Sequence, residues 1–201
     1  MATEARGLHR LEAIILAAGA GARFGGGKLM SPWRGGLLIE AALAAALAAP
    51  VRSVILVTGA DARVRPAAQA LAAMRGEAAR LRLVHAAGHA EGMAASLRAG
   101  LAALPADAAG AFVFLGDMPL IPPAILSPLA AALALGGKAA APVFEGRRGH
   151  PVLFSRSLFP SLKCLSGDAG ARTMLDDLGG DLALVQTDDP GVLFDVDTPQ
   201  G

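Results

Sequence analysis

A chain of 201 residues is long enough for one domain with a sizeable apolar core, held without disulfide or metal staples. Its formal net charge is only +1, from 18 basic and 17 acidic residues, which excludes the strong positive field typical of nucleic-acid and anionic-membrane binding. Aromatic residues make up 4% of the chain and tyrosine is absent, so stacking of single-stranded nucleic acid is not expected either.

Short apolar runs that stop at glycine alternate along the chain with apolar residues at helical spacing. The first pattern is typical of strands buried on both faces of a parallel sheet, and the second indicates helices between them. In chain order we expect strands at 13–16, 53–58, 82–84 and 111–115 and helices at 38–49, 64–74, 93–104 and 125–135. Strands at 139–144 and 151–154 flank the turn 145–149 as an inserted antiparallel hairpin. The predicted fold class is therefore α/β, a mostly parallel sheet with helices on both faces, in one domain over 1–201.

The cellular setting follows from cysteine usage and hydropathy. Cys164 is the single cysteine, and no CxxC-type metal spacing exists, which suits a reducing cytoplasm. Residues 1–10 carry no apolar signal core, and the longest apolar stretch, 37–51, is too short to span a bilayer. We expect a monomeric cytoplasmic protein that binds neither membrane nor nucleic acid.

A glycine-rich loop, Leu16 to Lys28, follows the first strand. Ligands gather at the carboxyl ends of parallel strands, where small residues let backbone N–H groups approach phosphates. Arg23 adds a bidentate guanidinium and Lys28 a point charge, a pair suited to a triphosphate. The alternative is a flexible turn without function, and the two cations weigh against it.

Two better-known phosphate loops fit this segment poorly. A Walker A loop requires glycine where Ala22 stands and serine or threonine where Leu29 stands. A dinucleotide fingerprint matches Gly19 and Gly21, but Phe24 occupies its third glycine position. A dinucleotide-dependent oxidoreductase stays open as an alternative function, as does a non-catalytic protein that delivers a cofactor.

Carboxylates stand where a metal–phosphate site needs them. Asp117 follows the strand 111–115, and burying a bare carboxylate there is costly unless it meets a ligand or a partner. Because Mg²⁺ takes one or two carboxylates plus phosphate oxygens, Asp117 is a candidate ligand, with turn capping as the alternative. Asp197 is a candidate second ligand or a helix N-cap, and Asp195, at strand spacing from it, is the alternative ligand.

These segments together resemble the MobA-like nucleotidyltransferase superfamily, most closely its MocA-type molybdenum cofactor cytidylyltransferase branch. They occur in the family's order and cover nearly the whole chain. The matching segments are LAAGAGARFGGGKL (16–29), GHAEGMAASLRAGL (88–101), FLGDMPLI (114–121), GRRGHPVLF (146–154), SGDAGAR (166–172) and DDPGVLFDVDTP (188–199).

The resemblance implies a three-layer, Rossmann-like nucleotide-binding fold that transfers CMP from CTP to a molybdopterin-type cofactor and releases pyrophosphate, with Mg²⁺ as cofactor. It also implies contact with a molybdoenzyme or its chaperone. Ser96 and the LAAG start favour CTP, since guanylyl-transferring relatives usually have LAGG. A guanylyl- or other nucleotidyl-transferase acting on another cofactor or on a sugar phosphate is the alternative.

Residue roles carry over by position. The resemblance assigns nucleotide binding to Leu16, Ala17, Ala18, Gly19, Gly21, Arg23, Lys28, Ser96 and Asp117, with Arg23, Lys28 and Asp117 catalytic. Asp117 with Asp197 (or Asp195) would hold the metal, and His150 and Arg172 would contact the acceptor. For Arg147 and Arg148 we favour a solvated hairpin tip, with contact to the acceptor's phosphate as the alternative. We interpret His85 and His89 as a strand-end residue and a loop residue.

Overall fold

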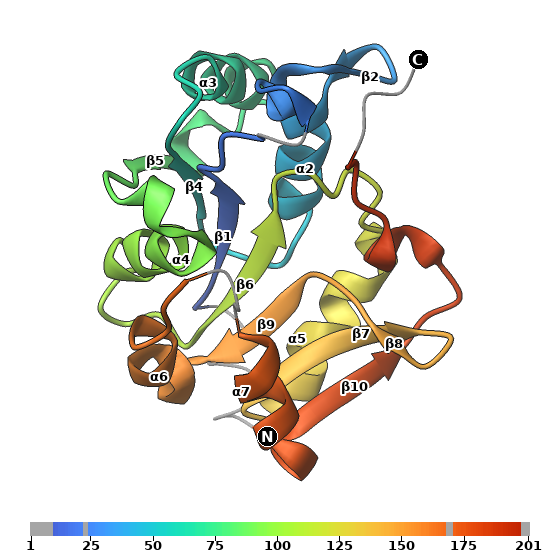
Figure 1. Cartoon of the computed structure of the whole chain (residues 1–201). Helices are drawn as coiled ribbons and strands as arrows, with labels where there is room; N and C mark the ends of the chain where they lie inside the picture. Colours follow the sequence, from blue (N-terminus) through green and yellow to red (C-terminus); the bar gives the residue numbers. More distant parts are fainter. Residues whose placement is uncertain (1–9, 22–23, 168–170, 198–201) are drawn as a thin grey trace.

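The computed structural model describes residues 10–21, 24–167 and 171–197, and it contains a mostly parallel central sheet (Figure 1). Seven strands follow the order β10–β7–β9–β6–β1–β4–β5, and the short β8 pairs with β7. The strands are β1 (Leu11–Ala17), β4 (Val54–Thr58), β5 (Leu81–His85), β6 (Gly110–Leu115), β7 (Ala139–Phe144), β8 (Arg147–Arg148), β9 (Val152–Ser155) and β10 (Leu182–Gln186). A separate two-stranded sheet joins β2 (Pro32–Trp33) to β3 (Gly36–Leu37).

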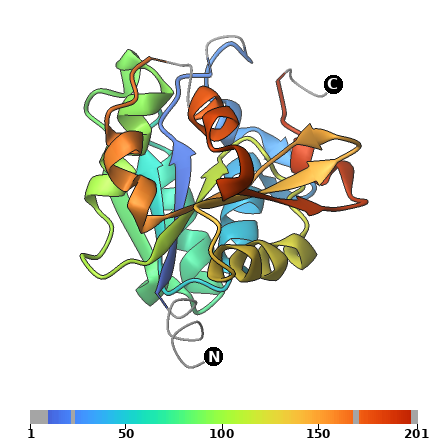
Figure 2. The same cartoon turned by 90° about the horizontal axis from the view of Figure 1, so that it is seen from below.

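Helices cover both faces of the sheet, as expected for an α/β fold. One face packs against α2 (Leu38–Leu47), α3 (Val64–Met74) and α5 (Leu126–Ala134). The other packs against α4 (Met93–Ala102), α6 (Phe159–Lys163) and α7 (Arg172–Asp177). Figure 2 shows α5 and α7 on opposite sides of the strands. The three-layer, Rossmann-like fold class is confirmed.

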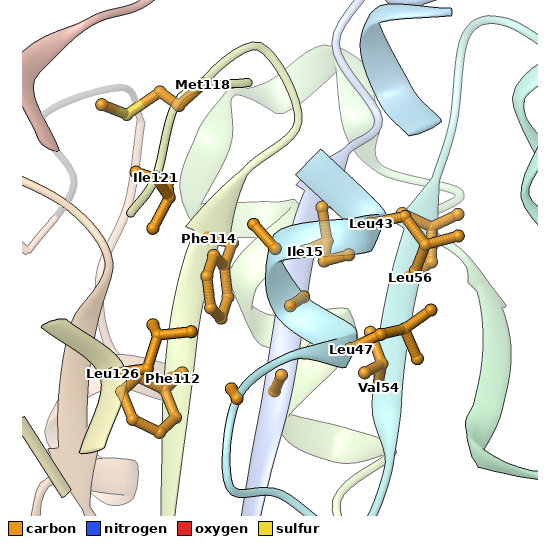
Figure 3. Packing of buried hydrophobic residues seen from close by; sticks show 14 of the residues in the cluster. Ile15, Leu43, Leu47, Val54, Leu56, Phe112, Phe114, Met118, Ile121 and Leu126 are labelled. Carbon is orange, nitrogen blue, oxygen red and sulfur yellow. The ribbon is translucent and has the colours of Figure 1, made fainter. Parts of the chain in front are cut away.

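The two-sided burial explains why the central strands are apolar without alternation. In β1, Ile14 belongs to the cluster under α4, and Ile15 belongs to the cluster under α2. Both are completely buried because successive side chains of a strand point to opposite faces. Figure 3 shows the α2 side of this core, where Ile15 lies with Leu43 and Phe114.

The predicted hairpin exists, but its strands belong to the central sheet. β9 runs antiparallel to both of its neighbours, β6 and β7, and the short β8 is likewise antiparallel to β7, whereas the other paired strands of this sheet are parallel. β10 at the edge completes the sheet by pairing parallel to β7. The sequence pattern did not indicate β10, α6, α7 or the small β2–β3 sheet.

The parallel strands end at one edge of the sheet. Ala17, the last residue of β1, pairs with Thr58 of β4, which in turn pairs with His85 of β5. On the other side of β1, Leu16 pairs with Leu115, the last residue of β6. The loops that follow these four strands therefore meet, and the turn after β7 reaches the same edge because β7 runs in the direction of β6.

At the opposite end of the sheet a buried carboxylate ties strands together. Glu12 of β1 is completely buried, and it accepts hydrogen bonds from Ser53 N at 3.0 Å, Ser53 Oγ at 2.6 Å and Arg52 Nε at 2.8 Å. Arg52 also donates to Asp107, so one guanidinium links β1 to the segment before β6. The negative charge of the Glu12 carboxylate strengthens each of these hydrogen bonds.

We expect Glu12→Ala to lower the free energy of unfolding by about 2 kcal/mol, because it leaves the part-buried donors of Ser53 unpaired and a cavity where the buried carboxylate lay. Denaturant unfolding measures the loss. Glu77→Ala is the matched control, since Glu77 forms a partly exposed pair with Arg80 and should cost less than about 1 kcal/mol. Equal effects of the two changes would contradict the structural role of Glu12.

Within residues 10–21, 24–167 and 171–197, no helix is both long and apolar enough to cross a membrane.

Candidate functional site

Two adjoining cavities open where the strand ends meet. The first, which we call the loop cavity, has a volume of about 550 Å³ and lies against the glycine-rich loop. It is lined by Leu16, Ala17, Ala18, Gly19, Ala20, Gly21, Lys28, Leu29, His89, Ala90, Gly92, Met93, Ser96, Leu115 and Asp117. Every described residue assigned above to nucleotide binding therefore lines one cavity. Arg23, the ninth, lies outside the described residues.

The loop itself is shaped by close backbone contacts. The carbonyl of Gly21 accepts hydrogen bonds from Phe24 N at 2.9 Å and Gly26 N at 3.1 Å. Gly21 has φ +62°, and a Cβ there would lie 2.9 Å from Cβ of Lys28. Glycine is therefore required at this position for conformation and for space. The turn brings Lys28, the first residue of a short 3₁₀ helix, back over the strand ends.

Lys28 contacts both of the predicted metal ligands, Asp117 and Asp197. Its Nζ lies 2.8 Å from Asp117 Oδ2 and 3.5 Å from Asp197 Oδ1, and 12% of its side chain is exposed. A backbone hydrogen bond of 3.0 Å from Val196 N to the carbonyl of Asp117 fixes the C-terminal segment beside the end of β6. Residues separated by up to 169 positions thus form one charged cluster.

Negative charge exceeds positive charge in this cluster. Burial raises the pKa of Asp195, and the charges of Asp197 and Asp117 raise it further, while Lys28 opposes the shift. Three carboxylates therefore share a single described cation.

The donor set of the cluster fits a hard divalent cation. Asp117 and Asp197 present oxygens to the same point, now held by Lys28 Nζ, and magnesium takes one or two carboxylates plus phosphate oxygens. In the described part of the chain, no group of three or more His, Cys, Asp or Glu side chains is placed to hold a metal. A cation here would need oxygens from a ligand to complete its coordination.

Ser96 and His89 occupy another part of the loop cavity. Ser96 lies on the first turn of α4 and is 5% exposed. His89 lies in the 3₁₀ turn before that helix and is half-buried. His89 was expected to be a loop residue without a ligand role, because nothing in the local sequence distinguishes it from an ordinary loop residue.

The second cavity, which we call the hairpin cavity, has a volume of about 620 Å³. Leu16, Met93 and Leu115 line both cavities, so the two adjoin at the ends of β1 and β6. The other lining residues are Ala94, Leu97, Val113, Gly146, Arg147, Arg148, Gly149, His150, Val152, Phe154, Ala171, Arg172, Leu175 and Asp176. Both predicted acceptor contacts, His150 and Arg172, lie here.

The interpretation of Arg148 as a solvated hairpin tip is wrong. Its side chain is 23% exposed, donates to Asp176 Oδ1 at 2.7 Å and lines the hairpin cavity. Arg147 is exposed, as expected, but it lines the same cavity. The local sequence could not reveal the pairing, because Asp176 stands 28 positions away on α7.

The environment of His150 disfavours its charged form. Burial lowers the pKa of His150, although a hydrogen bond with the Val113 backbone and the charge of Asp117 act in the opposite direction. Nδ1 is buried and has no hydrogen-bond partner among the described residues. The lowered pKa disfavours the charged imidazolium, and the guanidinium groups of Arg147, Arg148 and Arg172 carry the positive charge along the cavity.

A family model for the MobA-like NTP transferase domain matches residues 13–183. The chain belongs to this family. It is a nucleotidyltransferase, and the match extends from β1 into β10, over both cavities.

Two characterised relatives align over nearly the whole chain. The molybdenum cofactor cytidylyltransferase of Escherichia coli (strain K12) is 28% identical over 195 residues, covering 96% of this chain and 93% of the relative. The nicotine blue oxidoreductase of Paenarthrobacter nicotinovorans is 33% identical over 193 residues, covering 92% and 91%.

A solved structure of Rv0371c from Mycobacterium tuberculosis H37Rv is similar throughout, with a TM-score of 0.79 and 29% identity over 94% of this chain and 93% of that one. A complex of Rv0371c with manganese also matches, with a TM-score of 0.72 and 27% identity over 90% and 89% of the two chains.

Proposed function

We propose that this nucleotidyltransferase moves CMP from CTP onto a molybdopterin-type molybdenum cofactor in a Mg²⁺-dependent reaction that releases pyrophosphate. The observation that carries the proposal is the contact of Lys28, at the end of the glycine-rich loop, with Asp117 and Asp197. Lys28 and Asp117 line the loop cavity and Asp197 lies beside them, so a cation suited to phosphate and two carboxylates suited to a metal ion would act together there. The similarity to the Escherichia coli cytidylyltransferase supports CTP and the molybdenum cofactor as substrates.

In the proposed reaction, an oxygen of the acceptor's terminal phosphate attacks the α-phosphorus of CTP. The bond from that phosphorus to the bridging oxygen breaks, and pyrophosphate leaves with its electron pair. Such transfers depend on positioning and charge neutralisation more than on covalent help from the protein. The loop backbone and Lys28 would hold the β- and γ-phosphates, together with Arg23.

Asp117 and Asp197 would hold Mg²⁺, with Asp195 as the alternative ligand. The existence of a manganese complex of Rv0371c supports a divalent ion as the cofactor. When bound, the ion would neutralise charge on the phosphate oxygens. In its absence Lys28 offsets part of the charge of the same carboxylates and holds them together before nucleotide arrives.

The hairpin cavity would receive the acceptor. Its wall is apolar at Leu97, Val152 and Phe154, and cationic at Arg148 and Arg172, which suits a flat heterocycle that carries a phosphate. His150 would add a neutral contact. Because the two cavities share the residues at the ends of β1 and β6, a nucleotide in one and an acceptor in the other would meet beside Asp117.

We propose further that residues 1–201 form a single nucleotidyltransferase domain, acting as a cytoplasmic monomer that passes its product to a molybdoenzyme or its chaperone. The extent of the family match supports the single domain, and the single cysteine suits the cytoplasm.

The test is pyrophosphate release from CTP, GTP and UTP, each with Mg²⁺ and with or without molybdenum cofactor. We expect release from CTP that requires both metal and acceptor, and the largest thermal stabilisation by CTP among the three. Preference for GTP, or turnover only with a sugar phosphate as acceptor, would contradict the proposed substrates and leave nucleotidyl transfer intact.

A dinucleotide-dependent redox activity is a second candidate, favoured by the 33% identity to nicotine blue oxidoreductase. It predicts binding of NADH or NADPH without metal. A titration of nicotinamide fluorescence in the presence of EDTA separates the two candidates, because the proposed transferase should give no saturable signal.

A further inference from the structure

The three loops that follow β1, β4 and β5 pack tightly around His89. A Cβ at Gly59, in the loop after β4, would lie 2.8 Å from Cβ of His89 and 2.5 Å from the carbonyl oxygen of Ala18. Glycine at position 59 therefore lets the His89 side chain approach the backbone of the first loop. The position of His89 therefore depends on contacts between loops that are far apart in the sequence.

Local hydrogen bonds fix the turn that carries His89. Its N–H donates to the carbonyl of Ala86 at 3.1 Å, and Glu91 N donates to the carbonyl of Gly88 at 2.9 Å. The ring meets that of His85 edge to face, with centroids 6.2 Å apart. The turn is thus formed before any ligand binds, and the imidazole packs against a neighbouring ring.

Among the described residues lining the loop cavity, only four have a polar side chain: Lys28, His89, Ser96 and Asp117. Lys28 and Asp117 are bonded to each other and mark the phosphate end. Glu91, next to His89 in sequence, is engaged by Arg98 at 3.3 Å and does not line the cavity. The polar side chains left to meet the nucleoside are those of Ser96 and His89, and His89 has the only ring among the described lining residues.

We propose that His89 contacts the nucleoside half of the bound triphosphate by packing its ring on the base. This inference rests on the proposed nucleotide site. A base has a π-face, and the rest of the described cavity offers it no aromatic partner. A half-buried imidazole fixed at the cavity wall provides that surface without losing side-chain freedom on binding.

The experiment is a calorimetric titration of wild type, His89→Ala and His89→Phe with two ligands, CTP and inorganic tripolyphosphate, each with Mg²⁺. Tripolyphosphate carries the phosphate end alone. We expect His89→Ala to weaken CTP about tenfold and to leave tripolyphosphate unchanged, because one aromatic contact to a base is lost. His89→Phe keeps a ring and should bind CTP within about threefold of wild type.

The outcomes separate this inference from the proposed function. If wild type does not bind CTP, the nucleotide site itself is wrong and the His89 assignment falls with it. If wild type binds CTP and His89→Ala binds it equally well, only the His89 assignment is wrong. Equal weakening of both ligands, or no recovery in His89→Phe, also overturns it, since the ring would then not act on the base. Equal melting temperatures of the three proteins confirm that the fold is unchanged.

Discussion

Replacing Asp117 by asparagine is expected to lower kcat/KM for nucleotidyl transfer by about a thousandfold, which corresponds to about 4 kcal/mol of transition-state stabilisation. Asparagine keeps the shape of the side chain and one oxygen for Lys28 but removes the charge that would hold the metal. The fold should be unaffected, because the backbone carbonyl of Asp117 still accepts from Val196 N. Pyrophosphate release at increasing Mg²⁺ concentration measures the loss.

The matched control is Asp181→Asn. Asp181 also forms an ion pair with a lysine, Lys138 at 2.8 Å, but it lies on the surface and lines neither cavity. We expect its activity to stay within about twofold of wild type, as a surface pair contributes little. Full activity of Asp117→Asn would rule out Asp117 as the metal ligand. A fall in its melting temperature well beyond that of Asp181→Asn would mean that the carboxylate serves the fold instead.

Lys28→Met is expected to change two affinities in opposite directions. CTP binding should weaken by about ten- to a hundredfold, because a charge-assisted contact to phosphate is lost while the apolar stem remains. Binding of Mn²⁺ without nucleotide should tighten, because Lys28 Nζ no longer lies between Asp117 and Asp197. Calorimetry gives the first affinity, and electron paramagnetic resonance of free Mn²⁺ gives the second.

The opposite signs distinguish a direct role of Lys28 from a general loss of structure, which would weaken both ligands. Lys138→Met is the control, since its ammonium pairs with Asp181 far from the cavities, and neither affinity should change. Unchanged Mn²⁺ binding in Lys28→Met would show that the lysine and the cation do not compete for the carboxylates. Unchanged CTP binding would remove Lys28 from the phosphate site.

The sequence predicted the central strands because burial on both faces leaves them continuously apolar. It missed β10 because this strand lies at the sheet edge, where Leu184 is 55% exposed and no position is fully buried. The pattern LALVQ does not separate such a strand from a loop. Helices α6 and α7 span five and six residues, which is too short for apolar spacing to reveal a period.

Individual residues of the candidate site were predictable from the sequence, but the contacts between them were not. Lys28 and Asp117 each follow a buried strand, and the parallel arrangement brings such positions to one edge. Their direct contact was not predictable, because side chains 89 positions apart meet only through the packing of the whole sheet. The same holds for His89, whose position depends on the close approach of Gly59 to Ala18.

The reversed strand β9 separates the segments that border the two cavities. The strands that end at the loop cavity are all parallel, whereas the turn between β7 and β9 borders only the hairpin cavity. Exchanges at the exposed positions 145–147 would therefore reshape the hairpin cavity, the proposed acceptor site, without touching Lys28 or Asp117. For protein engineering, this turn is the segment to vary in order to change the proposed acceptor specificity while the loop cavity stays unchanged.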